Sequence, residues 1–459
     1  IVVTYKVFHF FSPNFNLMQA AFILPTLLAI IVAILAFFIG RKLMNVVAGF
    51  FASMFISLSP LFISRTIGSD TDIWNVFFPL LIILVFLYAF ETKSLWKRIV
   101  LTSINGLLIG LFSFAWASGW WYIFDFLILT LILYSLFELL HGYIHYKNII
   151  FSDEVKNASI ILITLFVSTL IFVSLFMSLN LFSGAFSNPM GMISGLQISV
   201  NANLWPNIYT TVAELNAASI STIISQTSFG MSIIFSLALL GIIFTLVKRY
   251  PDVKELVFIC GSVVIYFYLS TSNAMSLNSY NYLILLIIPV CVGLTLVLLS
   301  KEYIDTRIAI LLTIWFVGMI FASIRGVRFI LLLIPAFSIA LGISMGYLYQ
   351  YFSRLLEYLK CNITIAKVMA LSILCILLIN PITVGIAAGT SFMPTLTKGW
   401  SDSLIKIREE SMPDAIINSW WDFGHWFKYI ADRRVTLDGA SQNGPNAYWL
   451  GLLFQTNDE

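Results

Sequence analysis

Residues 16–39 read NLMQAAFILPTLLAIIVAILAFFI, an almost unbroken apolar run. A helix rises about 1.5 Å per residue, so about 20 apolar residues cross the hydrocarbon core of a bilayer. Eleven later runs have similar character, at 44–63, 73–91, 98–116, 119–140, 157–182, 230–247, 255–270, 281–299, 308–323, 327–349 and 364–388. The sequence therefore predicts an α-helical polytopic membrane protein with about twelve transmembrane helices.

The composition supports this prediction. The 459 residues are 60% hydrophobic and 10% charged, and the mean hydropathy is +0.95. A soluble protein carries about 25% charged residues, so an ordinary soluble fold is excluded. The net charge of +3 gives no indication of nucleic acid, and we expect no such partner. The four cysteines show no paired spacing that would indicate disulfides or a zinc site.

Basic residues divide unevenly between alternate connections, and cytoplasmic connections are usually the basic ones. One set holds fifteen: Arg41, Lys42, Lys93, Lys97, Arg98, Lys147, Lys156, Lys248, Arg249, Lys254, Lys301, Arg307, Arg354, Lys360 and Lys367. The other set, up to residue 388, holds four: Lys6, Arg65, Arg325 and Arg328. We therefore expect the external side to carry the loops 64–72 and 183–229 and everything after residue 388.

The composition changes after residue 388, because most of the charged residues outside the two sets named above occur there. We predict a transmembrane domain over 1–390 and the beginning of an external mixed α/β domain over 391–459. Within the second part, a turn at 411–414 precedes the short apolar run 415–417, which is typical of a buried strand.

That run leads into Trp420-Trp421-Asp422-Phe423-Gly424. Large apolar rings beside a single carboxylate suit recognition of a small ligand, because the rings shape a dry pocket and the carboxylate fixes orientation. The glycine permits a turn where a side chain would intrude. The alternative is an aromatic core patch of a soluble domain.

A second pattern lies at the external end of a predicted span, where Asp70 and Asp72 flank Thr71. Hard divalent cations prefer oxygen ligands, and two closely spaced carboxylates at a helix start supply them. Alternatively, Asp72 caps the helix predicted at 73–91, where negative charge favours the N-terminal end.

A third pattern is Thr211-Val212-Ala213-Glu214. It lies in the external loop 183–229, about 47 residues long, in which Glu214 is the single charged residue. Long loops are usually functional or disordered, so Glu214 is either a functional acid or a solvated loop residue.

Arg325 and Arg328 lie between two apolar spans. Ionisable groups at such a depth are functional candidates, although an arginine also extends its guanidinium to lipid headgroups.

Together, these motifs resemble the catalytic subunit of oligosaccharyltransferase, in its archaeal form, over essentially the whole chain. Trp420 to Gly424 is similar to the WWDYG signature, with Phe423 in place of the tyrosine. Asp70-Thr71-Asp72 is similar to the second acidic motif, and residues 211–214 are similar to the T-[I/V]-x-E motif. The resemblance implies a membrane glycosyltransferase of GT-C type.

The resemblance also implies roles for individual residues. Asp70 and Glu214 would be catalytic, and together with Asp72 they would hold a divalent metal, Mn²⁺ or Mg²⁺. Arg325 and Arg328 would be candidates for contact with the lipid phosphate. The acceptor would be bound by Trp420, Trp421, Asp422, Phe423, Gly424 and Arg328.

The implied reaction is a metal-dependent, inverting transfer of a glycan from a polyprenyl (dolichyl) phosphate or diphosphate carrier to asparagine of Asn-x-Ser/Thr in an acceptor protein. The site would lie on the external face of a prokaryotic, archaeal cell membrane. An alternative is another transferase of the same fold group that uses a polyprenyl-phosphate sugar, such as an O-mannosyl or lipid-sugar transferase, which lacks the WWDYG signature. The family's first acidic motif, opening helix and C-terminal motif are not found, so we expect a protein truncated at both ends.

Overall fold

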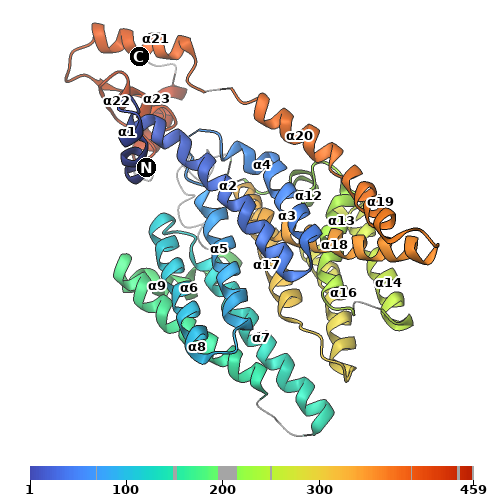
Figure 1. Cartoon of the computed structure of the whole chain (residues 1–459). Coiled ribbons are helices and arrows are strands. Elements are labelled where there is room, and N and C mark those ends of the chain that lie inside the picture. The colour runs from blue at the N-terminus through green and yellow to red at the C-terminus, as the bar shows by residue number, and fades with distance from the viewer. Residues whose placement is uncertain are drawn as a thin grey trace. The chain divides into compact units, whose positions relative to one another are not determined.

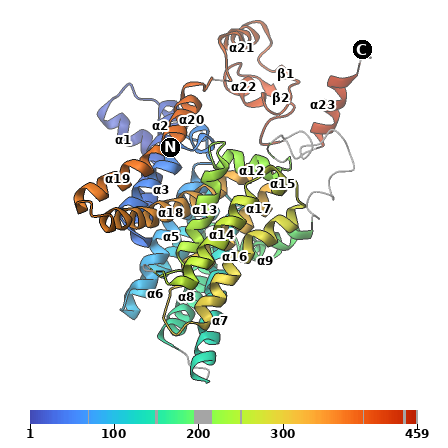
Figure 2. The same cartoon turned by 90° about the vertical axis from the view of Figure 1, so that its right-hand side faces the viewer.

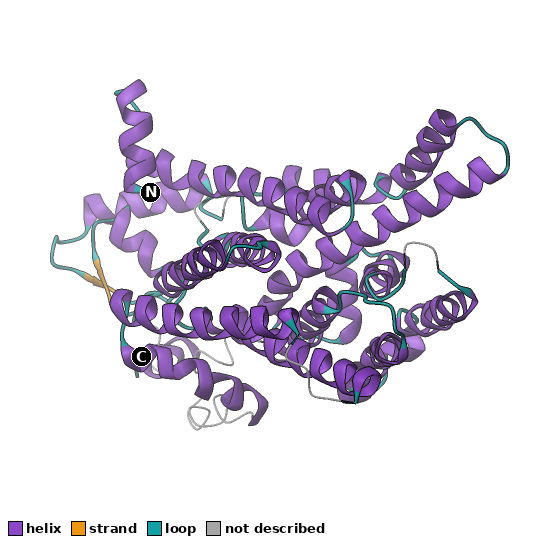
Figure 3. Cartoon of the chain, turned by 60° about the horizontal axis from the view of Figure 1, so that its bottom comes forward, coloured by secondary structure: helices purple, strands orange, loops and turns teal. Residues whose placement is uncertain are grey.

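The structure is a computed structural model of the chain. It describes residues 1–68, 70–147, 152–194, 214, 216–248, 251–393, 395–441 and 445–456. Its contacts divide the chain into two compact units. The membrane unit comprises Ile1–Pro189, Ala218–Ile324 and Arg328–Ser391, and the second unit comprises Met190–Ala217, Arg325–Val327 and Phe392–Glu459. Helices dominate, and the strands of the described residues form a single pair (Figure 3).

Eight helices of the described residues are long and apolar enough to cross a membrane. They are α2 (Leu17–Leu43), α5 (Trp74–Glu91), α6 (Leu95–Ala115), α7 (Trp121–Tyr146), α8 (Asp153–Phe176), α16 (Ser279–Leu299), α17 (Arg307–Arg325) and α18 (Ile330–Tyr358), the last preceded by the 3₁₀ turn η2 (Val327–Phe329). This arrangement confirms the predicted α-helical membrane protein.

Two bent pairs of helices are each long and apolar enough, taken together, to count as a candidate span. The axes of α12 (Ile220–Thr227) and α13 (Ser232–Phe244) differ by 86°, and those of α19 (Ile363–Ile376) and α20 (Ile379–Thr390) differ by 44°. Counting each bent pair as one span, the described residues supply up to ten candidate spans, and without the pairs they supply eight, against the twelve that the sequence predicts.

The other two predicted spans form shorter helices. The run 44–63 divides into α3 (Val46–Leu58) and α4 (Pro60–Ser64), because Ser59 adopts an extended backbone and Pro60 has no N–H to continue the helix. The run 255–270 forms α14 (Val253–Leu269), whose 17 residues rise about 25 Å, less than the thickness of about 30 Å of a bilayer core.

The remaining elements are short. They are α1 (Val2–Phe11), α9 (Leu179–Ser194), α15 (Ser272–Met275), α21 (Lys398–Glu410), β1 (Ile416–Ile417), α22 (Gly424–Tyr429), β2 (Arg434–Val435) and α23 (Asn446–Gln455). The predicted loop 183–229 is therefore partly helical, since α9 extends into it and α12 ends it. The strand predicted at 415–417 exists and pairs in parallel with β2, but Ile416 is exposed because the sheet has only two short strands.

The helix α18 forms the centre of the membrane unit. Its residues from Ile330 to Tyr347 are all buried, as expected for a helix that is apolar on every face. It packs against α3, α13 and α19, which lie beside it in two views (Figures 1 and 2).

Glycines allow the close helix crossings around α18. A Cβ at Gly241 of α13 would lie 2.6 Å from the carbonyl carbon of Ala340, and one at Gly342 would lie 2.6 Å from the carbonyl oxygen of Ala48. Small residues of this kind let helix backbones approach each other in membranes.

We expect Gly241→Ala to destabilise the membrane unit by about 1–3 kcal/mol, because the added methyl group meets the backbone of α18. Gly261→Ala on α14 is the matched control, since a Cβ there has open space. The measurement is the midpoint of thermal unfolding in detergent. Equal midpoints for the two variants would contradict this account of the crossing.

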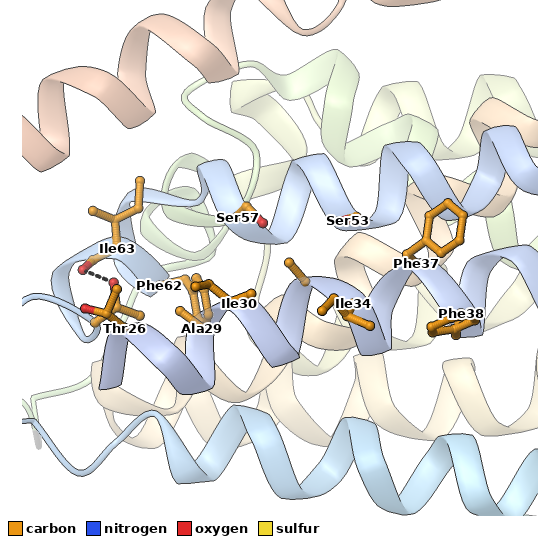
Figure 4. A pocket seen from close by; sticks show the side chains of 12 residues that line it. Thr26, Ala29, Ile30, Ile34, Phe37, Phe38, Ser53, Ser57, Phe62 and Ile63 are labelled. Carbon is orange, nitrogen blue, oxygen red and sulfur yellow. Dashed lines mark hydrogen bonds between the residues drawn. The ribbon is translucent and has the colours of Figure 1, made fainter. Parts of the chain in front are cut away.

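The membrane unit also carries an apolar groove of about 690 Å³, formed by α2, α3 and α4 (Figure 4). Ile30, Ile34 and Phe38 of α2 and Ser53 and Ser57 of α3 line it. Among the described residues, none of the predicted site residues lines this groove.

Candidate active site

The acidic pair occupies the turn between α4 and α5. Asp70 Oδ1 accepts a hydrogen bond from the backbone N–H of Asp72 at 2.9 Å, and Asp72 Oδ1 accepts one from Asn75 Nδ2 at 3.2 Å. The N-cap residue of α5 is Ile73, without a side-chain cap. Asp72 is therefore not the N-cap of α5, and its carboxylate instead accepts from the Asn75 side chain.

Both carboxylates converge on one cationic nitrogen. Arg65 Nη1 lies 3.1 Å from Asp70 Oδ2 and 3.7 Å from Asp72 Oδ2, and the two acid side chains are 28% and 18% exposed. Two partly accessible oxygens directed at one positive point have the donor chemistry that a hard divalent cation requires. Within the described ranges, however, three or more metal-ligating side chains do not gather at any point.

A second guanidinium flanks Asp72. Arg328 Nη2, in η2, lies 3.8 Å from Asp72 Oδ1, so Asp72 lies between Arg65 and Arg328. Arg325 ends α17 and belongs to the second unit. Arg65 and Asn75 were not among the site residues predicted from the sequence. The signal that was available for Arg65 is a single basic residue five positions before an acid.

Glu214 also belongs to the second unit, while residues 211–213 of its motif lie outside the described residues. The backbone carbonyl oxygen of Asn216, two residues after Glu214, accepts a hydrogen bond of 2.8 Å from the backbone N–H of Val327. Val327 belongs to the second unit as well, so this hydrogen bond lies within that unit.

The tryptophans of the predicted acceptor string, Trp420 to Gly424, pack in the second unit. Trp420 and Trp421 lie against a buried cluster of Leu437, Ala447 and Leu450. The rings therefore belong to a core patch, as one alternative held. However, the Trp421 Nε1 donor is buried and has no hydrogen-bond partner among the described residues.

Phe423 and Asp422 differ in their surroundings. The Phe423 ring stacks on Trp400 of α21, with 5.1 Å between ring centroids, and contacts Trp426 at 5.4 Å. The Asp422 side chain is exposed, and partial burial of its carboxyl raises its pKa above the usual value. The string thus presents a carboxylate to solvent beside tightly packed rings.

Gly424 begins α22 at a close approach of two backbone segments. A Cβ there would lie 2.6 Å from the Cβ of Asp438, so only glycine fits without displacement. Asp438 is 1% exposed and accepts hydrogen bonds from Lys428 Nζ, Ser441 Oγ and the backbone N–H groups of residues 440 and 441. The Lys428 ammonium and the Ser441 hydroxyl hold the pKa of Asp438 well below its usual range.

We expect the second unit to lose stability in acid through Asp438. An aspartate in the unfolded chain has a pKa of about 3.9 and Asp438 has a lower one when folded, so its contribution is complete above about pH 4 and is lost as the pH falls further. Tryptophan fluorescence should show a steeper loss of stability below about pH 4 for the wild type than for Asp438→Asn. Parallel pH profiles would contradict this role of the carboxylate.

The chain matches known proteins along its length. The family "Oligosaccharyl transferase STT3, N-terminal" matches residues 1–384, and the "STT3/PglB/AglB core domain" matches residues 413–459. The dolichyl-phosphooligosaccharide-protein glycotransferase of Methanococcus voltae is 26% identical over 539 residues, covering 100% of this chain and 54% of the relative. The glycotransferase of the same name from Methanocaldococcus jannaschii is 27% identical over 357 residues, covering 74% of this chain and 38% of the relative.

Solved structures of the Archaeoglobus fulgidus oligosaccharyltransferase share the fold. One, in complex with an inhibitory peptide and a dolichol-phosphate, has a TM-score of 0.59 at 14% identity and covers 96% of this chain and 56% of the other. Another, tethered to an acceptor peptide with the NVT sequon, has a TM-score of 0.56 at 14% identity and covers 96% of this chain and 55% of the other. A complex with zinc and sulfate has a TM-score of 0.52 at 15% identity and covers 96% of this chain and 53% of the other.

This likeness establishes a GT-C membrane fold, and the chain spans about half the length of the first curated relative and of the solved structures. The family match extends over residues 1–384 and thus over most of the chain. The chain therefore belongs to the STT3 family of oligosaccharyl transferases.

Proposed function

We propose that the protein carrying this chain is an oligosaccharyltransferase. It would transfer a glycan from a polyprenyl (dolichyl) phosphate or diphosphate carrier to the amide nitrogen of asparagine in Asn-x-Ser/Thr. The chain belongs to this family, and one observation on its structure carries the proposal. Asp70 and Asp72 converge on Arg65 at the end of a membrane-length helix, and Arg328 lies beside Asp72. Acids and cations at the edge of a span suit a reaction between a membrane lipid and a protein.

Asp70, Asp72 and Glu214 would hold a divalent cation, Mn²⁺ or Mg²⁺. The support is the donor chemistry, because two carboxylate oxygens face one cationic point. A bound metal would supply stabilisation of the charge that develops on the leaving phosphate.

The carboxylates of Asp70 and Glu214 would also act on the acceptor amide. An amide nitrogen is a weak nucleophile, because its lone pair is delocalised into the carbonyl. Carboxylates that accept hydrogen bonds from the amide N–H groups weaken this delocalisation and can take up the proton that the nitrogen loses. The nitrogen would then attack the anomeric carbon from the side opposite the phosphate, which inverts the configuration.

The string from Trp420 to Gly424 would recognise the acceptor hydroxyl. Trp421 Nε1 is a donor without a partner among the described residues, and Asp422 offers an exposed acceptor. Leaving a buried donor unsatisfied costs about 1–3 kcal/mol, which a hydroxyl group of serine or threonine would offset. Phe423 has no phenol and is packed against Trp400, so it would support the string by packing.

Two arginines would assist phosphate binding. Arg328 lies beside Asp72, and Arg325 ends the preceding helix. Guanidinium groups bind phosphate through charge-assisted hydrogen bonds. The site would face the outside of an archaeal cell membrane, with 1–390 as the transmembrane domain and 391–459 as the beginning of the external domain.

We expect Arg328→Ala to weaken binding of the lipid donor or the acceptor peptide by about tenfold, since it removes a charge-assisted contact. Arg408→Ala on the exposed face of α21 is the matched control. Titration of both ligands measures the effect. Unchanged affinity for both would refute a role of Arg328 in binding.

A transfer assay tests the proposed function. Membranes that contain the protein are incubated with a lipid-linked glycan, a fluorescent Asn-x-Thr peptide and Mn²⁺, and the peptide is followed by electrophoresis. The expected result is a shift that EDTA and Glu214→Gln abolish and that Glu409→Gln, an exposed acid of α21, retains. Absence of a shift with several lipid donors would refute the function.

A further inference from the structure

The two carboxylate oxygens of Asp438 bond different parts of the second unit. Oδ1 accepts from the N–H of Ala440 at 3.0 Å, from the N–H of Ser441 at 2.9 Å and from Ser441 Oγ at 2.7 Å, which closes its own turn. Oδ2 instead accepts from Lys428 Nζ of α22. A buried charge is retained only where its partners compensate for lost solvation, so Asp438 joins its turn firmly to α22.

The same turn contacts the acceptor string at both ends. Before the string, Ser419 Oγ donates to the carbonyl oxygen of Leu437 at 3.4 Å. After it, Gly424 lies so close that a Cβ would meet Asp438. Leu437 itself belongs to the buried cluster against which Trp420 and Trp421 pack. The segment of Leu437 and Asp438 therefore contacts the residues at both ends of the string.

We propose that Asp438 is a positioning residue for acceptor recognition. Through Lys428 it fixes α22, and through its turn it fixes the Trp421 indole and the Asp422 carboxylate in the arrangement that binds the acceptor hydroxyl. The inference rests on the proposed function of the string. Asp438 acts on binding of the peptide rather than on the chemistry at the amide, which is assigned to Asp70 and Glu214.

The test compares three variants with a matched control. Asp438→Asn and Lys428→Met each remove the ion pair, whereas Lys428→Arg retains a cation. Asp432→Asn makes the same change of charge at an exposed position in the same unit. Misplacing the string weakens the charge-assisted hydrogen bond to the acceptor hydroxyl, so we expect the KM for an Asn-x-Thr peptide to rise about tenfold to a hundredfold in the first two variants. The kcat and the KM for the lipid donor should stay within about twofold of the wild type, as should both parameters of Lys428→Arg and Asp432→Asn.

Direct binding of the peptide separates the possible results. The inference would be overturned, and the proposed function left intact, if the Asp438→Asn variant bound the peptide as the wild type does. The same holds if this variant lowered kcat without raising the KM for the peptide. A wild type that neither transfers to nor binds the peptide would overturn both. Because Asp438→Asn removes a buried charge, Lys428→Met, at a half-exposed side chain, provides the test if the first variant does not fold. Hydrogen exchange over 420–427 should rise in both ion-pair variants while exchange over 398–410 stays unchanged.

Discussion

The variant Asp70→Asn is expected to lower the rate of glycan transfer by about a hundredfold to a thousandfold, the usual cost of removing one preorganised charge-stabilising group. Asparagine has almost the same shape but no charge, so it can neither pair with Arg65 nor accept a proton from the acceptor amide. The measurement is the single-turnover rate at saturating donor and peptide.

Asp402→Asn, at an exposed position of α21, is the matched control and should transfer at the wild-type rate. A folded Asp70→Asn variant with a rate within about threefold of the wild type would show that this carboxylate takes no part in the reaction.

The second large effect concerns discrimination between acceptor peptides. A site that hydrogen-bonds a substrate hydroxyl rejects the analogue without it by about 10⁴ to 10⁵, because its polar groups are then left unpaired. We expect Asp422→Ala to reduce the preference for Asn-x-Thr over the isosteric Asn-x-Val by about a hundredfold or more. Trp421→Phe removes the N–H that has no partner among the described residues and retains an aromatic ring, and it should reduce the preference by a smaller factor.

Trp449→Phe, at an exposed tryptophan of α23, is the control for the loss of an indole. The preference should also fall as the pH falls through the pKa of Asp422, which burial raises, because a protonated carboxyl no longer accepts from the hydroxyl. An unchanged ratio of kcat/KM values in Asp422→Ala would place the specificity elsewhere.

The membrane helices could be predicted because burial in lipid requires long apolar runs, and hydropathy detects these directly. The bends were harder to predict. One helix breaks at Leu377, four residues before Pro381, whose ring conflicts with that carbonyl, so the sequence did carry a signal. The 86° bend before α13 depends on positive φ angles at Phe229 and Gly230, and nothing in the local pattern marks the phenylalanine.

For the candidate site, too, the sequence predicted the residue types but not all of their contacts. The spacing of Asp70 and Asp72 predicted a pair of oxygen ligands, and the structure directs both at a single point. The identity of that point, Arg65, could not be predicted, because its partners depend on how the turn after α4 folds. Asp438 and Lys428 were missed for a similar reason, since their contact joins a turn to a helix and follows neither a helical nor a strand period.

Mass spectrometry of the transfer product tests the central claim most directly, because it identifies the atom that receives the glycan. The protein is incubated with a lipid-linked glycan and a peptide that contains Asn-x-Thr together with additional serine and threonine residues, and fragmentation locates the added mass. The account predicts the glycan on the asparagine side chain of the Asn-x-Thr segment alone. A glycan on a serine or threonine oxygen would contradict it and would instead indicate a transferase that glycosylates hydroxyl groups.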